Sequence, residues 1–125
     1  MWFCLGVALL ASVGIIAIGV VYVFNPQGAA QSFGLPLPEK DPNIAWWLRL
    51  KGVRDVVAGL GVLALMVWAE PRVLGIVLFI DSFIAMGDMS LILAAKGSTK
   101  AALGMHGLTA ALMIAASIPL IIGGV

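Results

Sequence analysis

Four long apolar stretches account for most of the chain, and short polar segments rich in proline, glycine and lysine separate them. Each stretch holds the roughly 20 residues that a helix needs to cross the hydrocarbon core of a bilayer. The pattern predicts an all-α fold, an integral membrane four-helix bundle that forms one domain over residues 1–125. We expect the four helices at about residues 2–24, 44–69, 72–95 and 100–122.

The segment between the first two helices, residues 25–43, is predicted to be a polar loop. It holds four of the six prolines, and a proline in a helix interior removes a backbone hydrogen bond. Residues 29–34 within it are expected to form a short interfacial turn. Pro71 and Gly97 mark the ends of the second and third helices.

Composition supports the membrane interpretation and excludes several classes of function. Hydrophobic residues make up 62% of the chain and charged residues 10%, whereas a soluble domain carries about 25% charged residues. The lipid bilayer is therefore the expected surrounding. A net charge of +1 offers no basic surface, so no nucleic acid is expected as a partner. Cys4 is the only cysteine, which leaves no disulfide framework, and we expect a buried thiol.

The distribution of basic residues predicts how the helices are oriented. Most basic residues lie at one side of the predicted bundle, on or beside the loops before the second and fourth helices: Lys40, Arg49, Lys51, Lys96 and Lys100. The opposite side has only Arg72, next to Glu70. Because basic residues favour the cytoplasmic side, we expect both termini on the non-cytoplasmic side of the membrane.

Seven ionisable residues fall inside the predicted helices, and these are the main candidates for function. Each charge at membrane depth costs at least about 2.5 kcal/mol, and such residues are by default functional candidates. Three are basic, three are acidic, and the seventh is the only histidine: Arg49, Lys51, Arg54, Asp55, Asp81, Asp88 and His106. The first helix supplies none of them. We expect the other three helices to bring them together in a buried Arg/Asp/His cluster.

Helical spacing predicts which of these side chains meet. Lys51 and Asp55 are four residues apart and are expected to pair along the second helix. Asp81 and Asp88 are seven residues apart, so they lie on one stripe of the third helix. Arg54 is expected to form an ion pair with at least one of the three aspartates.

The same positions resemble a family of small four-helix membrane proteins described as domain of unknown function 4267. The resemblance runs from Trp46 onward, over about the last two-thirds of the chain. Its residues are the motif Lys51-Gly52-Val53-Arg54-Asp55 with Gly59, then Arg72, Gly75, Ala85 and Asp88, and finally Ala101, Ala102 and His106. The resemblance implies a four-helix membrane fold, and no activity comes with it.

The first functional hypothesis is a membrane-embedded acid–base enzyme that acts on a lipophilic small molecule. Carboxylates, a histidine and an arginine in one desolvated site are the groups that such chemistry needs. Asp88 and His106 are the expected proton-transferring pair, and Arg54 is expected to anchor an oxygen or a developing anion. Asp55 and Asp81 serve as partners or as a second acid. Isomerisation, cyclisation and the opening or hydration of an epoxide all fit these groups without a cofactor.

Contacts to the substrate are expected from residues at the cytoplasmic end of the second helix and from the stripe that His106 shares in the fourth: Trp47, Arg49, Lys51 and Met113. A metal site is not expected. Two aspartates and one histidine resemble a facial triad, but the chain has no second histidine and no closely spaced ligand pair.

Two other classes of function remain open at the level of sequence. The chain has the length and helix count of small multidrug-resistance transporters, which are proton-coupled and work as homodimers. Their glutamate in the first helix has no counterpart here. Alternatively, the charges only hold the helices in register, as buried polar pairs do in some proteins.

Overall fold

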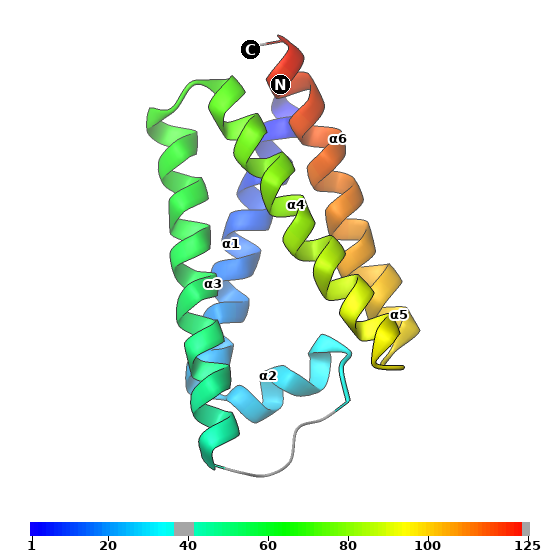
Figure 1. Ribbon diagram of the computed structural model, residues 1–125. Helices are drawn as coiled ribbons and strands as arrows, with labels where there is room; N and C mark the ends of the chain where they lie inside the picture. Colours follow the sequence, from blue (N-terminus) through cyan, green and yellow to red (C-terminus); the bar gives the residue numbers. More distant parts are fainter. Residues whose placement is uncertain (37–41, 124–125) are drawn as a thin grey trace.

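A computed structural model describes residues 1–36 and 42–123, and these residues form helices and no strand. The helices are α1 (Trp2–Phe24), α2 (Pro26–Phe33), α3 (Pro42–Trp68), α4 (Pro71–Ala94), α5 (Thr99–Ala101), η1 (Ala102–Gly107) and α6 (Leu108–Gly123). α5, η1 and α6 follow one another without a break and form one long helical segment. α1 begins and α6 ends at the same end of the bundle, whereas α2 and α5 lie at the opposite end (Figure 1).

Three helical segments are long and apolar enough to span a membrane. They are α1 with 23 residues, α4 with 24 and the continuous segment Thr99–Gly123 with 25. α3 is longer, with 27 residues, but its first half carries four charged side chains between Arg49 and Asp55. The all-helical, membrane-like character expected from the sequence is therefore confirmed for three segments, and α3 is the exception.

Glycines set how closely the long helices approach one another. α1 and α3 run side by side in opposite directions (Figure 1). At their crossing, a Cβ atom added to Gly52 would lie 2.5 Å from the carbonyl oxygen of Gly19. α4 packs along α6 in the same way, and a Cβ on Gly75 would lie 2.7 Å from Cβ of Leu120. Small residues at such crossings let helix backbones come close, which is typical of helix packing in lipid.

The main apolar core lies in the half of the bundle that contains both termini. It joins α1, α3, α4 and α6 through the buried residues Cys4, Ala8, Val62, Leu74, Leu78, Met113, Ala116 and Leu120. Cys4 is a buried free thiol, as expected. Met113 packs in this core, so the structure places it among apolar neighbours rather than beside the charged residues.

The predicted loop after the first helix is wrong for residues 26–33, which form α2. Three local features explain this helix. The Asn25 side chain accepts a hydrogen bond from the Gly28 amide at 3.2 Å, and Pro26 occupies the first turn, where its missing N–H costs nothing. Gly34, with a φ of 112°, ends the helix in the left-handed conformation that favours glycine. Residues 37–41, the rest of that predicted loop before α3, lie outside the described residues.

α2 is fastened to the connection between α4 and α5. The Ser98 amide donates a hydrogen bond to the Gly34 carbonyl at 2.7 Å. The Ser98 side chain caps α5 by accepting a hydrogen bond from the Ala101 amide at 3.1 Å. A single residue therefore both starts the last helical segment and holds the end of α2.

Candidate acid–base site

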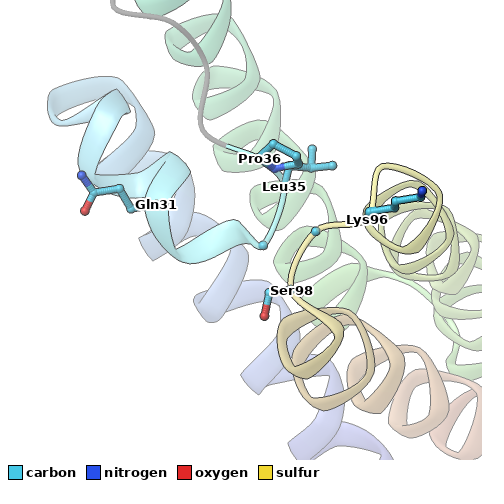
Figure 2. A pocket seen from close by; sticks show the side chains of 7 residues that line it. Gln31, Leu35, Pro36, Lys96 and Ser98 are labelled. Carbon is cyan, nitrogen blue, oxygen red and sulfur yellow. The ribbon is translucent and has the colours of Figure 1, made fainter.

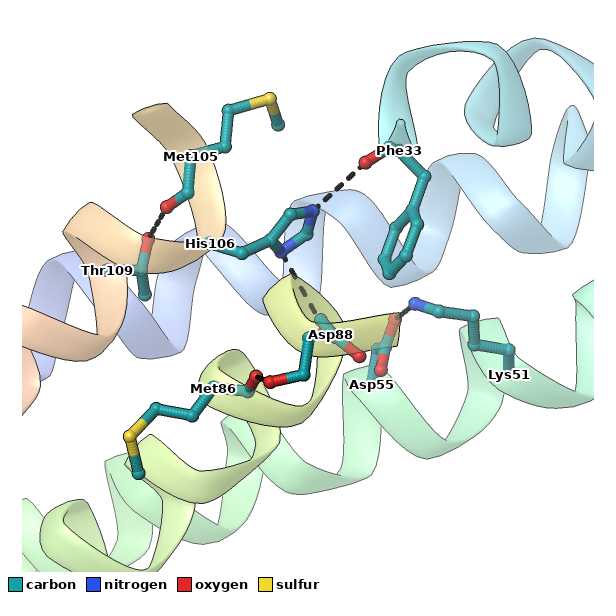
Figure 3. Close-up of polar contacts among 9 residues, drawn as sticks. Phe33, Lys51, Asp55, Met86, Asp88, Met105, His106 and Thr109 are labelled. Carbon is teal, nitrogen blue, oxygen red and sulfur yellow. Dashed lines mark hydrogen bonds and ion pairs between the residues drawn. The ribbon is translucent and has the colours of Figure 1, made fainter. Parts of the chain in front are cut away.

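Polar side chains from three helical segments lie beneath α2. On α4 the site residue is six residues before the end of the helix at Ala94, which is about 9 Å at a rise of 1.5 Å per residue. Asp88 comes from α4, His106 from η1, and Lys51 with Asp55 from α3, while Phe33 of α2 lies next to them (Figure 3). The side chains of His106 and Asp88 are 13% and 31% exposed. The site is thus partly desolvated and is covered from the side of α2.

His106 is held from both of its ring nitrogens. Nε2 lies 3.0 Å from the carbonyl oxygen of Phe33, and Nδ1 lies 3.8 Å from Oδ2 of Asp88 (Figure 3). A carbonyl oxygen only accepts hydrogen bonds, so Nε2 must carry a hydrogen and donate it. The backbone of α2 therefore determines that Nε2 of the imidazole carries a hydrogen.

This selection has a consequence for the other side of the ring. In the neutral imidazole with hydrogen on Nε2, Nδ1 presents a lone pair toward Asp88. Two acceptors that face each other repel unless a proton lies between them, either on Nδ1 or on the carboxyl group. Oδ2 of Asp88 faces Nδ1 at 3.8 Å, an ion-pair distance that is longer than a hydrogen bond.

Lys51 and Asp55 form the pair that their spacing predicts. Nζ of Lys51 donates to Oδ2 of Asp55 at 2.7 Å, so the two charges balance within α3. The same ammonium group lies 4.3 Å from the ring centre of Tyr22 and 5.1 Å from that of Phe33. Attraction between the cation and these ring faces helps to hold the lysine in the interior.

Phe33 links the two ionisable pairs. Its ring centre lies 4.6 Å from that of His106, with 51° between the ring planes, and its carbonyl accepts the histidine hydrogen bond. The sequence placed Phe33 in a predicted loop, and no pattern marked it as part of a site. Phe33 reaches the site because α2 lies across the end of the bundle (Figure 1).

His106 belongs to a π-helical turn, which the sequence did not predict. η1 covers Ala102–Gly107 and interrupts the α-helical hydrogen bonding of the last segment. Such turns are rare and frequently occur at functional sites. Here the extra residue per turn changes the direction in which side chains leave the helix, and His106 points toward Phe33 and Asp88 (Figure 3).

The prediction that Arg54 forms an ion pair with an aspartate is wrong. Among the residues that the structure describes, Arg54 pairs with no aspartate, and it is exposed. The reason is its position on α3. Gly52 faces α1, and two residues further along a helix the side chain points about 200° away from that direction. Arg54 thus lies on the side of α3 away from α1.

Among the predicted site residues, Lys51 lies at this site, whereas Asp81, Arg49 and Trp47 do not. Asp81 is half-buried two helical turns from Asp88 and forms no ion pair or hydrogen bond within the described part of the chain. Arg49 donates from Nε to the Val23 carbonyl at 3.2 Å, and its guanidinium lies 4.7 Å from the ring centre of Trp46. Trp47 is 69% exposed.

Tyr22 is a site residue that the sequence analysis missed. It is the only tyrosine of the chain and is 3% exposed, and its ring lies beneath the Lys51 ammonium group. Because that ammonium group pairs with Asp55 at 2.7 Å, Tyr22 lies beside the Lys51–Asp55 pair. The signal that could have found it is a phenol near the end of a helix that has no charged side chain.

Neither of two surface hollows in the described part of the chain is lined by Asp88 or His106. The larger, about 560 Å³, lies between the end of α2 and the connection from α4 to α5 (Figure 2). Its walls are Gln31, Gly34, Leu35, Pro36, Lys96, Gly97 and Ser98. The smaller, about 260 Å³, is an apolar groove between α1 and α3. Within residues 1–36 and 42–123, no three His, Cys, Asp or Glu side chains lie where they could hold a metal ion.

Comparison with known proteins identifies the family of the chain. The family model described as "Domain of unknown function (DUF4267)" matches residues 12–120, which include every residue of the site. The chain therefore belongs to this family, and the resemblance found in the sequence is confirmed. No curated protein and no solved structure matches it.

Proposed function

We propose that the chain is a membrane-embedded acid–base enzyme in which Asp88 and His106 transfer a proton to and from a lipophilic small molecule. One observation carries the proposal. The hydrogen bond from Nε2 of His106 to the Phe33 carbonyl leaves Nδ1 facing the Asp88 carboxylate, which favours one shared proton. A pair that holds one proton in a partly desolvated site can act first as an acid and then as a base.

The proposed setting is a bundle of four membrane spans, with α3 as the fourth. At 1.5 Å per residue its 27 residues extend about 40 Å, more than the roughly 30 Å of a hydrocarbon core. The charged half of α3 lies toward the end of the bundle that holds α2. Lys96 and Lys100 lie at that same end, which supports the proposal that both termini are on the non-cytoplasmic side.

The reaction class follows from what the pair can do alone. With its proton, the pair protonates an oxygen of the substrate, and without it, the pair removes a proton from a carbon or a hydroxyl group. An isomerisation or cyclisation uses both steps in turn and returns the pair to its starting state, so no cofactor is consumed. Opening an epoxide uses the acid step first.

The test starts with the molecule that the protein carries. The full chain is purified in mild detergent, and native mass spectrometry determines whether a small molecule remains bound and gives its mass. The complex is then incubated in D2O. An acid–base enzyme exchanges a carbon-bound hydrogen of its substrate with solvent, so the bound molecule or its product gains deuterium.

Matched variants give this test its specificity. Asp88→Asn keeps the shape of the side chain but cannot take the shared proton, and we expect deuterium incorporation to fall at least 100-fold. Ser90→Ala is the control, because Ser90 is exposed on the same helix and bonds only to the Met86 carbonyl. A native chain that holds no small molecule, or holds one without incorporating deuterium, contradicts the proposal.

A structural role is the second candidate, and one observation favours it. The hydrogen bonds from His106 to Phe33 and from Ser98 to Gly34 both fasten α2 to the bundle. If this is the whole role, Asp88→Asn unfolds more easily and no ligand is found. If the chain is instead a ligand-free dimer, and sealed vesicles that contain it accumulate protons, the result favours the proton-coupled transporter.

A further inference from the structure

The Tyr22 hydroxyl is a hydrogen-bond donor without an acceptor. Within the described residues it makes no hydrogen bond, although the centre of its ring lies 4.3 Å from the Lys51 ammonium group that pairs with Asp55. A phenol in the interior normally has a partner, because an unmade hydrogen bond there is destabilising. The position of Tyr22 thus leaves one donor of the site unused.

This hydroxyl is not sealed inside the protein. Every fully buried side-chain oxygen or nitrogen in the described part of the chain has a hydrogen-bond partner. The Tyr22 oxygen has none, so the small exposed fraction of this residue, 3%, includes the hydroxyl. A molecule that reaches the site from outside can therefore meet it.

The surrounding charges determine which kind of molecule fits. The Lys51 ammonium group above the Tyr22 ring is already neutralised by Asp55 at 2.7 Å. With the ammonium charge balanced in this way, the pair leaves no net positive charge to attract an anion to the hydroxyl. A neutral oxygen acceptor, such as that of a ketone, ester or epoxide, accepts the phenol hydrogen bond without bringing charge into the bilayer.

We propose that Tyr22 is the residue that binds the substrate, by donating a hydrogen bond to a neutral oxygen of a lipophilic molecule. The inference rests on the proposed function, because it places the substrate oxygen next to the proton-sharing pair of Asp88 and His106. It adds a residue that supplies no proton of its own and holds the oxygen in reach of that pair. The hydrogen bond strengthens as negative charge develops on the oxygen.

The only tyrosine of the chain makes the test direct. Tyrosine labelled with ¹³C at Cζ gives a single resonance in the full chain, reconstituted in phosphatidylcholine nanodiscs. The probe is 2-undecanone and the control ligand is n-undecane, which has the same chain without the oxygen. We expect the ketone to shift the Tyr22 signal with saturation, and the alkane to leave it unchanged.

A second measurement uses Tyr22→Phe, which keeps the ring under the lysine and removes only the hydroxyl. Affinity is followed from the labelled carbonyl carbon of the ketone. Loss of one neutral hydrogen bond weakens ketone binding about three- to tenfold. Equal affinity in this variant, no saturable shift, or the same shift with n-undecane would overturn the inference.

This test reads binding and not turnover, which separates the two proposals. If the ketone binds through Tyr22 but the native chain incorporates no deuterium into its ligand, the acid–base proposal fails and the binding role of Tyr22 stands. If deuterium is incorporated and Tyr22→Phe binds the ketone as tightly as the native chain, only the role of Tyr22 fails.

Discussion

Replacing Gly52 by alanine tests whether the close crossing of α1 and α3 positions the site. The added Cβ would lie 2.5 Å from the Gly19 carbonyl oxygen and 2.8 Å from Cβ of Tyr22. An ordinary carbon–oxygen contact is about 3.3–3.6 Å, so the two helices must separate by about 1 Å. Gly52 adjoins Lys51, and the ammonium contact with the Tyr22 ring must then change as well.

The magnitude follows from two opposing effects. Overpacking costs about 1–3 kcal/mol, whereas alanine in place of glycine in a helix stabilises it by about 0.8–1 kcal/mol. Gly61→Ala provides the control, because Gly61 lies on the same helix with nothing within 4 Å of its added Cβ. Both variants gain the same helix propensity, so we expect Gly52→Ala to be less stable than Gly61→Ala by about 1–3 kcal/mol.

The assay is reversible unfolding in mixed detergent micelles, followed by circular dichroism as the fraction of denaturing detergent rises. The free energy of unfolding of each variant is compared with that of the native chain. Equal stability of Gly52→Ala and Gly61→Ala would show that α1 and α3 do not meet at Gly19 and Gly52, and would refute the crossing on which the position of Tyr22 depends.

Three further predictions concern the ionisable pairs and α2. In a double-mutant cycle, Lys51→Met and Asp55→Leu should show a coupling energy of about 0.2–1 kcal/mol in the same unfolding assay, and additive effects would contradict the ion pair. The only histidine gives one pair of ¹⁵N ring signals, and Asp88→Asn should move that of His106 Nδ1 while Nε2 stays protonated; an unchanged Nδ1 signal would argue against the shared proton. Ser98→Ala removes a helix cap and should cost about 0.5–2 kcal/mol, and an unaltered unfolding curve would exclude this capping role.

Local patterns were enough for features that depend on one helix. The pairing of Lys51 with Asp55 follows from a spacing of four residues on an α-helix, and the structure has it at 2.7 Å. The apolar character of α1 and α4 is likewise a property of consecutive residues. α2 is absent from the elements that the sequence predicts, although Asn25, Pro26 and Gly34 are a local capping pattern, because prolines within a segment predict a break in the helix.

The sequence by itself determined that the chain is helical and apolar enough for a membrane, which charges it carries there, and which of them are neighbours on one helix. Only the tertiary structure decided which charges meet between helices. A spacing along the chain sets a direction around the helix axis but not which helix lies in that direction. Arg54 therefore lies apart from the aspartates, whereas His106 meets Asp88 because η1 turns it toward α4 and α2 holds its other nitrogen. Tyr22 joins them because glycines let α1 and α3 approach closely, a contact that no pattern within either helix specifies.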